Sequence, residues 1–398
     1  MSQTDRTRSV QFIDNYFPVI DGVTLTVHNY ALHMNAAVVC PAMERDYSEK
    51  YRFSYPLLVA RTARVPFSRY ASALPALDGK LSAEILQQSP EIFHVHSPSL
   101  LGNYAVSLGK KEGIPVVATF HSKVYDAILE FTKSKAIAKT MTQRIVRLYE
   151  ACDEVWACSE ESGETLRSYG FRGSYFVMPN GAETAVPENT DELREKAAAA
   201  FRIPRGKRVL LFVGQQIWYK NQRLILDTFR LLCDQCDDFF LIMAGAGKDE
   251  KDIERYAASL NLSEDQIRFA GLVRDRDLLS GLYVNADLLF FPSVFDNAPL
   301  VLREAAVLGV PTLVTEGSNA AGAIRKNVNG FTAEATAEAM RDEILRIFSR
   351  EDLKQIGQSA RETIPISWEK LADMVQDRYR TVIERYREKE QTCKGERE

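Results

Sequence analysis

The sequence predicts an α/β fold built from two doubly wound, Rossmann-like domains, and three observations lead to this prediction. The chain has 398 residues, which is too long for one ordinary hydrophobic core. Short apolar runs of strand length alternate with helical patterns along both halves of the chain. Glycine, proline and polar residues follow several of these runs, as expected for loops at the carboxyl ends of parallel strands.

Composition and charge narrow the class of protein. Apolar residues make up 45% of the chain and charged residues 26%, which is typical of a globular protein. The formal net charge of −4 argues against extensive nucleic-acid binding. The six cysteines are scattered, so they do not indicate a disulfide framework. Cys233 and Cys236 form a lone CxxC in a helical run; we interpret them as packed thiols, with a metal or redox role as the less favoured alternative. The start of the chain lacks a signal peptide's apolar core, and no run reaches 18 apolar residues, so we expect a cytoplasmic protein.

The amino-terminal half begins with a predicted strand over residues 9–14, a loop, and a helix over 23–34. Gly22 stands just before that helix, where backbone N–H groups can face a phosphate, although an ordinary turn glycine would look the same. Residues 51–77 read as loop-rich. Further strands are predicted over 36–40, 91–96 and 115–119.

Histidines cluster around the last two of these strands. His94 and His96 lie on one face of a strand. A histidine in such a position is more often a buried structural residue than a zinc ligand, and the sequence offers no third ligand at a spacing typical of zinc sites. His121 directly follows a strand, which places it at a carboxyl edge and makes it a candidate for the site; His96 is a second one. Residues 133–147 form a basic amphipathic helix, suited either to an anionic membrane leaflet or to an ordinary solvated surface.

The carboxyl-terminal half repeats the strand–loop–helix pattern. A strand over 209–213 ends in Gly214, and a loop with Gln215 and Lys220 leads into a helix from 222, a setting suited to a diphosphate. Gly245 and Gly247 follow a strand over 239–244, and Arg274 follows one over 267–271.

Two carboxylates mark the stretch 286–319. A buried strand over 288–291 leads into a loop, a helix over 300–308 that Gly309 ends, and a strand over 310–314. Asp296 lies in the loop and Glu304 in the helix, with seven residues between them. Carboxylates accept hydrogen bonds, so a hydroxyl-rich ligand such as a sugar nucleotide suits the pair. The alternative is that Asp296 caps a turn and Glu304 is solvated.

This spacing resembles the acid-x7-acid motif of retaining GT-B glycosyltransferases, in particular those of family four (group 1). The segments HVHSPSLLG and IPVVATFHS are similar to the branch of diacylglycerol glucosyltransferases. The resemblance covers nearly the whole chain and implies two Rossmann-like domains facing across a cleft. It implies an acceptor-side domain over 1–185, completed by a last helix over 367–390, and a nucleotide-sugar domain over 186–366.

The resemblance also implies roles for single residues. Asp296 and His121 would contact the transferred sugar, Glu304 the ribose hydroxyls, and Lys220 the leaving diphosphate. The remaining expected nucleotide-binding positions are Gly22, Gly214, Gln215, Gly245, Gly247, Arg274, Asn297 and Leu300. Three positions depart from the family pattern: Asp296 replaces a glutamate, Gln215 replaces an arginine, and Asp21-Gly22 replaces two glycines.

The sequence therefore predicts a retaining glycosyltransferase that moves a hexose from a nucleoside-diphosphate sugar, with UDP-sugar favoured, to an acceptor hydroxyl. A membrane lipid is a candidate acceptor, and the helix over 133–147 would hold the protein at the inner face of the membrane. No obligatory cofactor or metal is expected, because no aspartate-x-aspartate motif stands where such a transferase would need one, although Asp275 and Asp277 flank Arg276. The net charge argues against a nucleic-acid partner. Two alternatives remain: a nucleotide-sugar epimerase or hydrolase of the same fold, and a non-catalytic nucleotide-binding relative.

Overall fold

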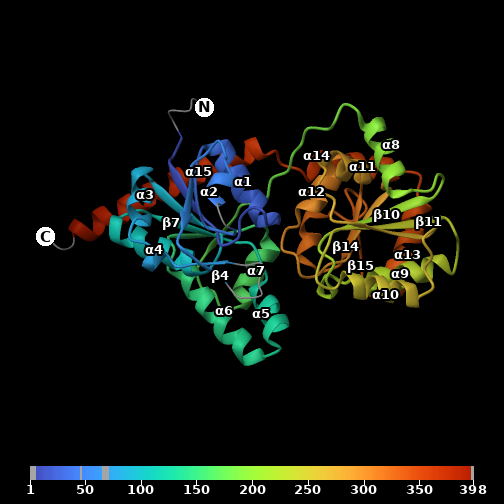
Figure 1. Ribbon diagram of the computed structural model, residues 1–398, viewed down its shortest axis with the longest axis horizontal. Helices are drawn as coiled ribbons and strands as arrows, with labels where there is room; N and C mark the ends of the chain where they lie inside the picture. The colour runs from blue at the N-terminus through green and yellow to red at the C-terminus, as the bar shows by residue number, and fades with distance from the viewer. Residues whose placement is uncertain (1–5, 45–46, 65–70, 396–398) are drawn as a thin grey trace. The chain divides into compact units, whose positions relative to one another are not determined.

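The computed structural model describes residues 6–44, 47–64 and 71–395 (Figure 1). The chain forms two compact units, one of Met1–Asn180 together with Trp368–Glu398 and the other of Gly181–Ser367. Each unit is an α/β domain around one parallel sheet.

The first unit is built on a seven-stranded sheet in the order β3-β2-β1-β6-β7-β8-β9, with parallel pairing throughout the order. The order reverses between β1 and β6, which makes the loops after these two strands the place where such a sheet binds ligands. The strands are β1 (Ser9–Phe12), β2 (Ala37–Pro41), β3 (Leu57–Ala60), β6 (Ile92–Val95), β7 (Val116–Phe120), β8 (Glu154–Ala157) and β9 (Tyr175–Val177).

Helices connect these strands, and the segment expected to be loop-rich contains β3 and a small antiparallel hairpin as well. The hairpin consists of β4 (Thr62–Arg64) and β5 (Ala71–Ala73), and a 3₁₀ helix (Pro75–Leu77) follows it. The helices of this unit are α1 (Gly22–Met34), α2 (Tyr47–Lys50), α3 (Leu81–Gln87), α4 (Leu100–Glu112), α5 (Val124–Thr132), α6 (Lys135–Glu150), α7 (Glu160–Ser168) and α15 (Trp368–Gly395).

Helix α15 comes from the far end of the chain yet packs in the first unit, where Figure 1 shows the red helix among blue and cyan elements. Tyr379 of α15 is fully buried, and its hydroxyl lies 2.6 Å from His94 Nδ1. Arg378 makes two hydrogen bonds to the carboxylate of Glu154 on β8. The helix thus supplies both core and polar contacts to a sheet that the first half of the chain forms.

The second unit repeats the doubly wound order with six parallel strands, β12-β11-β10-β13-β14-β15. Its central strands are apolar and buried on both faces, as parallel strands covered by helices must be. The order reverses between β10 and β13. The strands are β10 (Arg208–Val213), β11 (Phe239–Ala244), β12 (Ile267–Gly271), β13 (Leu288–Phe291), β14 (Thr312–Thr315) and β15 (Phe331–Ala333).

The helices of the second unit are α8 (Thr190–Phe201), α9 (Gln222–Cys233), α10 (Glu250–Ser259), α11 (Arg276–Asn285), α12 (Leu300–Val307), α13 (Ala337–Phe348) and α14 (Leu353–Thr363), with 3₁₀ turns at Trp218–Lys220 and Asn319–Ala323. Gly309 follows α12 with φ +73°, so the predicted left-handed glycine at this helix end is confirmed. Cys233 and Cys236 are free thiols packed against the hydrophobic core.

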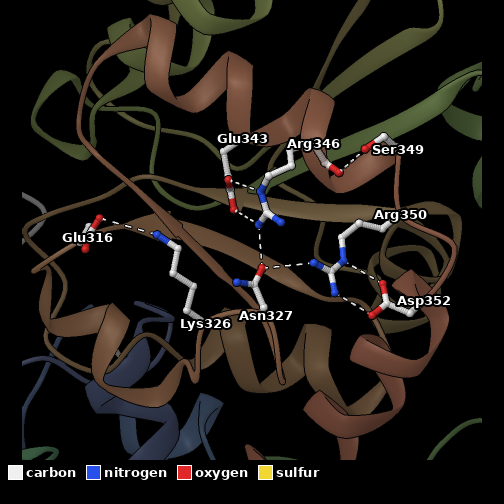
Figure 2. A network of polar contacts seen from close by, with 8 residues as sticks. All are labelled: Glu316, Lys326, Asn327, Glu343, Arg346, Ser349, Arg350 and Asp352. Carbon is white, nitrogen blue, oxygen red and sulfur yellow. Dashed lines mark hydrogen bonds and ion pairs between the residues drawn. The ribbon is translucent and has the colours of Figure 1, made fainter.

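A polar network fixes the turn that leads into β15. Figure 2 shows Arg346 and Arg350 converging on Asn327, whose Oδ1 accepts from both guanidinium groups at 2.7 and 3.5 Å. Asn327 has φ 63°, a left-handed conformation that asparagine tolerates better than most residues. Each arginine also pairs with a carboxylate, Glu343 or Asp352, at 2.6 Å. The charges are compensated within the network, which indicates a structural role.

The predicted helix over 133–147 is wrong at its amino end. Helix α5 ends at Thr132, and Lys133 then adopts φ 53°, which breaks the helix. The Ser134 side chain caps α6 by accepting from the N–H of Ile137, so the basic helix starts at Lys135. Helix α5 was not expected at all. The last helix also runs past the predicted end at 390, to Gly395.

Candidate functional site

A pocket of about 200 Å³ opens in the first unit at the ends of β1, β6 and β7. It lies where the strand order reverses, because the loops after β1 and β6 diverge there. Its lining is Ile13, Asn15, Asp21, Val23, His96, Ser97, Pro98, His121, Ser122, Val124 and Tyr149. Both histidines that the sequence indicated, His96 and His121, therefore lie in one pocket wall.

Beneath the pocket, hydrogen bonds fix the tautomers of His96 and His121. The Gln11 amide nitrogen lies 2.9 Å from Ser9 Oγ, so Gln11 Oε1 accepts from His96 Nε2 at 2.9 Å. His96 Nδ1 is then an acceptor, and His121 Nε2 donates a hydrogen bond to it at 2.9 Å. His121 Nδ1 is left as an acceptor, and the thiol of Cys158 lies 3.6 Å from it and 3.8 Å from the carbonyl oxygen of Phe120. Both ring nitrogens of His121 thus face other groups of the protein.

These histidines, with His94, form a cluster that is neutral at pH 7; we call His94, His96 and His121 the histidine cluster. Burial lowers the pKa of His121 to about 4. Burial lowers the pKa of His94 and His96 well below the ordinary value, and the neighbouring histidines add to the effect. Burial also raises the pKa of Asp14, at the end of β1, to about 6.

The amino end of α1 already carries an anionic side chain. Asp21 is the N-cap, and its Oδ1 accepts from the N–H of Thr24 at 2.8 Å. Gly22 is the first helical residue, beside this cap. The N–H groups that were expected to face a phosphate at Gly22 thus have a carboxylate next to them, and Asp21 lines the pocket.

In the second unit, Lys220 and Asp296 meet where the order of strands reverses. Lys220 ends the loop after β10, Asp296 lies in the loop after β13, and Lys220 Nζ is 2.6 Å from Asp296 Oδ1. Only 15% and 20% of the two side chains are exposed, so the pair is poorly screened. Ser293 Oγ donates to Asp296 Oδ2 at 2.5 Å. Asn221 Nδ2 donates to the carbonyl of Pro292, which ties the two loops together.

Glu304, on α12, is held by two residues of α11. The hydroxyl of Tyr283 donates to Glu304 Oε2 at 2.9 Å, and Arg276 Nη1 lies 3.5 Å from Glu304 Oε1. Tyr283 is buried and Arg276 is 65% exposed. Burial, followed by the Glu304 carboxylate, raises the pKa of Tyr283 well above its ordinary value, so Tyr283 stays a donor. Glu304 is therefore oriented by both contacts and partly accessible.

The glycines after β10 and β11 allow two loops to touch. A Cβ on Gly245 would lie 1.9 Å from the carbonyl oxygen of Gly214, and one on Gly247 would lie 2.2 Å from that of Gln216. Gly245 also has φ +128°. Packing alone thus explains glycine at 245 and 247, whatever else these loops bind.

The other expected nucleotide-binding residues fall into two groups. Gln215 and Arg274 have exposed side chains, and the Gln215 carbonyl accepts from Gln222. Asn297 is buried, and its Oδ1 accepts from Asn319, while Leu300 is the first residue of α12. Within the described ranges, the structure holds no group of three or more His, Cys, Asp or Glu side chains placed so that they could hold a metal ion, and no helix long and apolar enough to cross a membrane.

Sequence reasoning missed Gln11, Tyr283 and Ser293, the residues that orient the expected ones. Gln11 lies in the predicted strand over 9–14 but was not singled out there, and Tyr283 lies in α11, a helix that the sequence analysis did not predict. Ser293 offered a weak signal, since a serine directly after a strand-ending proline often caps a turn.

Comparison with known proteins shows which family the chain resembles. Residues 194–363 match the profile of glycosyl transferases group 1, and residues 20–186 match that of glycosyltransferase family 4. The α-monoglucosyldiacylglycerol synthase of Streptococcus pneumoniae is 25% identical over 76% of this chain and 69% of its own. A GDP-mannose-dependent α-mannosyltransferase of Corynebacterium glutamicum is 23% identical over 80% of this chain and 74% of its own.

Solved structures show the same fold. Anabaena Alr3699/HepE in complex with UDP and glucose has a TM-score of 0.71 and 17% identity, with 93% of this chain and 98% of that chain covered. The sucrose-phosphate synthase of Thermosynechococcus elongatus has a TM-score of 0.72 and 16% identity, with 95% and 99% covered. The resemblance to family four and to the GT-B fold is confirmed: the chain belongs to the group 1 glycosyltransferases of the GT-B fold.

Proposed function

We propose that this glycosyltransferase is a retaining enzyme that transfers a hexose from a UDP-sugar to a hydroxyl of a membrane lipid. The observation that carries the proposal is the pairing of Lys220 with Asp296 at the switch point of the second unit, with the oriented Glu304 in the same unit. The relatives support it, because one is named a glucosyldiacylglycerol synthase and a structural neighbour holds UDP and glucose.

The second unit would hold the donor. Glu304 would accept hydrogen bonds from the ribose hydroxyls, and Asp296 would accept them from the hexose. As the bond between the anomeric carbon and the phosphate oxygen breaks, negative charge develops on the diphosphate, and Lys220 would neutralise it. The acceptor oxygen bonds to the anomeric carbon, and its proton passes to the leaving phosphate. Lys220 Nζ is already held by Asp296 at 2.6 Å, so little reorganisation is needed.

The first unit would hold the sugar and the acceptor through its pocket. Because both ring nitrogens of His121 are engaged, the hexose contact expected of this residue would go to its main chain. The chain of hydrogen bonds from Gln11 would then act by holding that backbone in place.

The hairpin of α5 and α6 would contact the membrane at the inner leaflet. Figure 1 shows the two helices side by side, and they extend away from the sheet of the first unit. Phe131 is 90% exposed at the end of α5, and Ile137 and Met141 are exposed on α6. Exposed basic residues surround them on α6: Lys135, Lys139, Arg144 and Arg147. Apolar and basic side chains together suit an anionic leaflet.

The experiment measures binding and transfer separately. Thermal unfolding with UDP at about 100 times its Kd should show about 2.7 kcal/mol of stabilisation. Glu304→Ala should lose most of this, whereas Glu316→Ala, which removes a 59% exposed carboxylate in the same unit, should keep it. With UDP-hexose and diacylglycerol vesicles, the product should be a glycolipid with the donor's anomeric configuration.

Three results would reject the proposal. If UDP stabilised Glu304→Ala as much as it stabilises the parent, Glu304 would not be the residue that contacts the ribose. Conversion of the sugar nucleotide without any acceptor would indicate an epimerase or hydrolase. UDP binding with no turnover of any UDP-, GDP- or ADP-hexose would indicate a non-catalytic relative.

A further inference from the structure

The pocket of the first unit has a carboxylate and no cation among its described lining residues. Asp21 is the charged member. Its polar companions are the amide of Asn15 and the hydroxyls of Ser97 and Ser122. These groups exchange hydrogen bonds with hydroxyls without needing a charged partner.

The two histidines of the wall add no positive charge at neutral pH. Burial keeps the pKa of His96 and His121 below the usual histidine range, and their ring nitrogens already serve one another, Gln11 and Cys158. A phosphate entering the pocket would therefore find no imidazolium to pair with.

The basic residue closest in sequence to the wall is not one of the lining residues. Lys123 stands between Ser122 and Val124, which both line the pocket, and its charge acts on Asp126 of α5. Burial raises the pKa of Asp126, and Lys123 partly opposes that shift. Asp14, at the end of β1, contributes further negative charge once it is ionised.

Asp21 is held in place by the helix that it caps. Its Oδ1 accepts from the N–H of Thr24, so the positive end of α1 is matched by this carboxylate. Oδ2 of a carboxylate fixed in this way can accept from a ligand hydroxyl, whereas a second anion at the same place meets like-charge repulsion.

We propose that this pocket binds the uncharged, hydroxyl-bearing part of the acceptor, a glycerol or sugar unit, and that Asp21 makes the enzyme reject acceptors that carry a phosphate next to the attacked hydroxyl. The inference rests on the proposed transfer to a lipid hydroxyl and names the chemical class of acceptor. It assigns Asp21 as a residue that determines specificity.

Short-chain, water-soluble acceptors test this without a membrane. The parent enzyme is given a UDP-hexose and either dihexanoylglycerol, its monohexosyl derivative or dihexanoylphosphatidylglycerol. We expect a kcat/KM at least about tenfold lower for the phosphate-bearing acceptor, because its charge lies near Asp21. The first two acceptors distinguish a glycerol unit from a sugar unit.

Asp21→Asn removes the charge and keeps a side chain that caps helices well. This variant should accept dihexanoylphosphatidylglycerol about tenfold better relative to dihexanoylglycerol, with its UDP-dependent stabilisation unchanged. Asp78→Asn is the matched control, since Asp78 also accepts backbone N–H groups in this unit, from Arg61 and Lys80, and does not line the pocket. Its preference should equal that of the parent.

The outcomes separate this inference from the proposed function. Normal transfer with no preference against the phosphate acceptor, or with a preference that Asp21→Asn leaves unchanged, overturns the role of Asp21 and leaves the glycosyltransferase proposal standing. Absence of UDP-dependent stabilisation and of any transfer overturns the proposed function. Calorimetric titration with dihexanoylglycerol and dihexanoylphosphatidylglycerol tests the inference without turnover: equal or tighter binding of the phosphate-bearing lipid overturns it.

Discussion

Replacing Tyr283 with phenylalanine removes one hydroxyl and tests whether Glu304 depends on it for its orientation. The hydroxyl donates to Glu304 Oε2 at 2.9 Å from a buried position. A hydrogen bond to a charged group contributes about 1.5–3 kcal/mol. Glu304 is 21% exposed, so water can replace part of this bond, and we expect the low end, about 1.5 kcal/mol. The Kd for UDP should therefore rise about tenfold.

A double-mutant cycle gives the decisive measurement. UDP binding is titrated calorimetrically for the parent, Tyr283→Phe, Glu304→Ala and the double variant. If Tyr283 acts through Glu304, its replacement should change the Kd little once Glu304 is alanine. A Kd for Tyr283→Phe equal to that of the parent would refute the reasoning. So would equal effects of Tyr283→Phe in both backgrounds, because they would show a general loss of structure.

Three further predictions follow from the same contacts. As the pH falls below about 6.5, the histidines of the unfolded chain bind protons that the folded histidine cluster does not, which destabilises the fold, while Asp14, whose pKa is raised to about 6 in the fold, partly opposes this. Urea titrations should show the free energy of unfolding falling by roughly 2–3 kcal/mol between pH 6 and 5, and a flat profile would contradict the neutral cluster. Gly247→Ala should cost about 2 kcal/mol in chemical denaturation and weaken UDP binding, because its Cβ would meet a backbone oxygen at 2.2 Å, whereas Gly79→Ala, with nothing within 4 Å, should cost nothing. Lys220→Met should lower kcat/KM on the order of 100-fold in a transfer assay, and a change under threefold would show that Lys220 serves only to pair with Asp296.

The parallel sheets and their loops were predictable because local signals encode them. The strand at Leu288–Phe291 is four apolar residues ended by a proline, and Gly309 closes the following helix. Since every parallel strand delivers its loop to the same sheet edge, the same signals placed Lys220 and Asp296 at that edge. The strand order that sets β10 beside β13, and the contact of the two side chains at 2.6 Å, came from the structure.

The orienting residues were not predictable, because their roles depend on partners far along the chain. Tyr283 meets Glu304 across 21 positions, and Gln11 meets His96 across 85. No periodicity or spacing relates such residues, and only the packing of α11 beside α12, or of β1 beside β6, brings them together. Helix α5 escaped for another reason. It is only nine residues long, and the residue before it, Lys123, makes no side-chain capping hydrogen bond, so the sequence carries no start signal for this helix.

The return of α15 to the first unit makes that unit discontinuous in sequence, whereas residues 181–367 form the second unit without a break. During synthesis the second unit can therefore complete its core while the first still lacks the segment that carries Tyr379 and Arg378. A premature stop before Trp368 would leave Glu154 without the arginine Arg378 and His94 without the hydroxyl of Tyr379. Both of these residues lie in the first half of the sequence, far from the deleted segment. Truncation at the carboxyl terminus should thus destabilise the first unit, most of which is translated first.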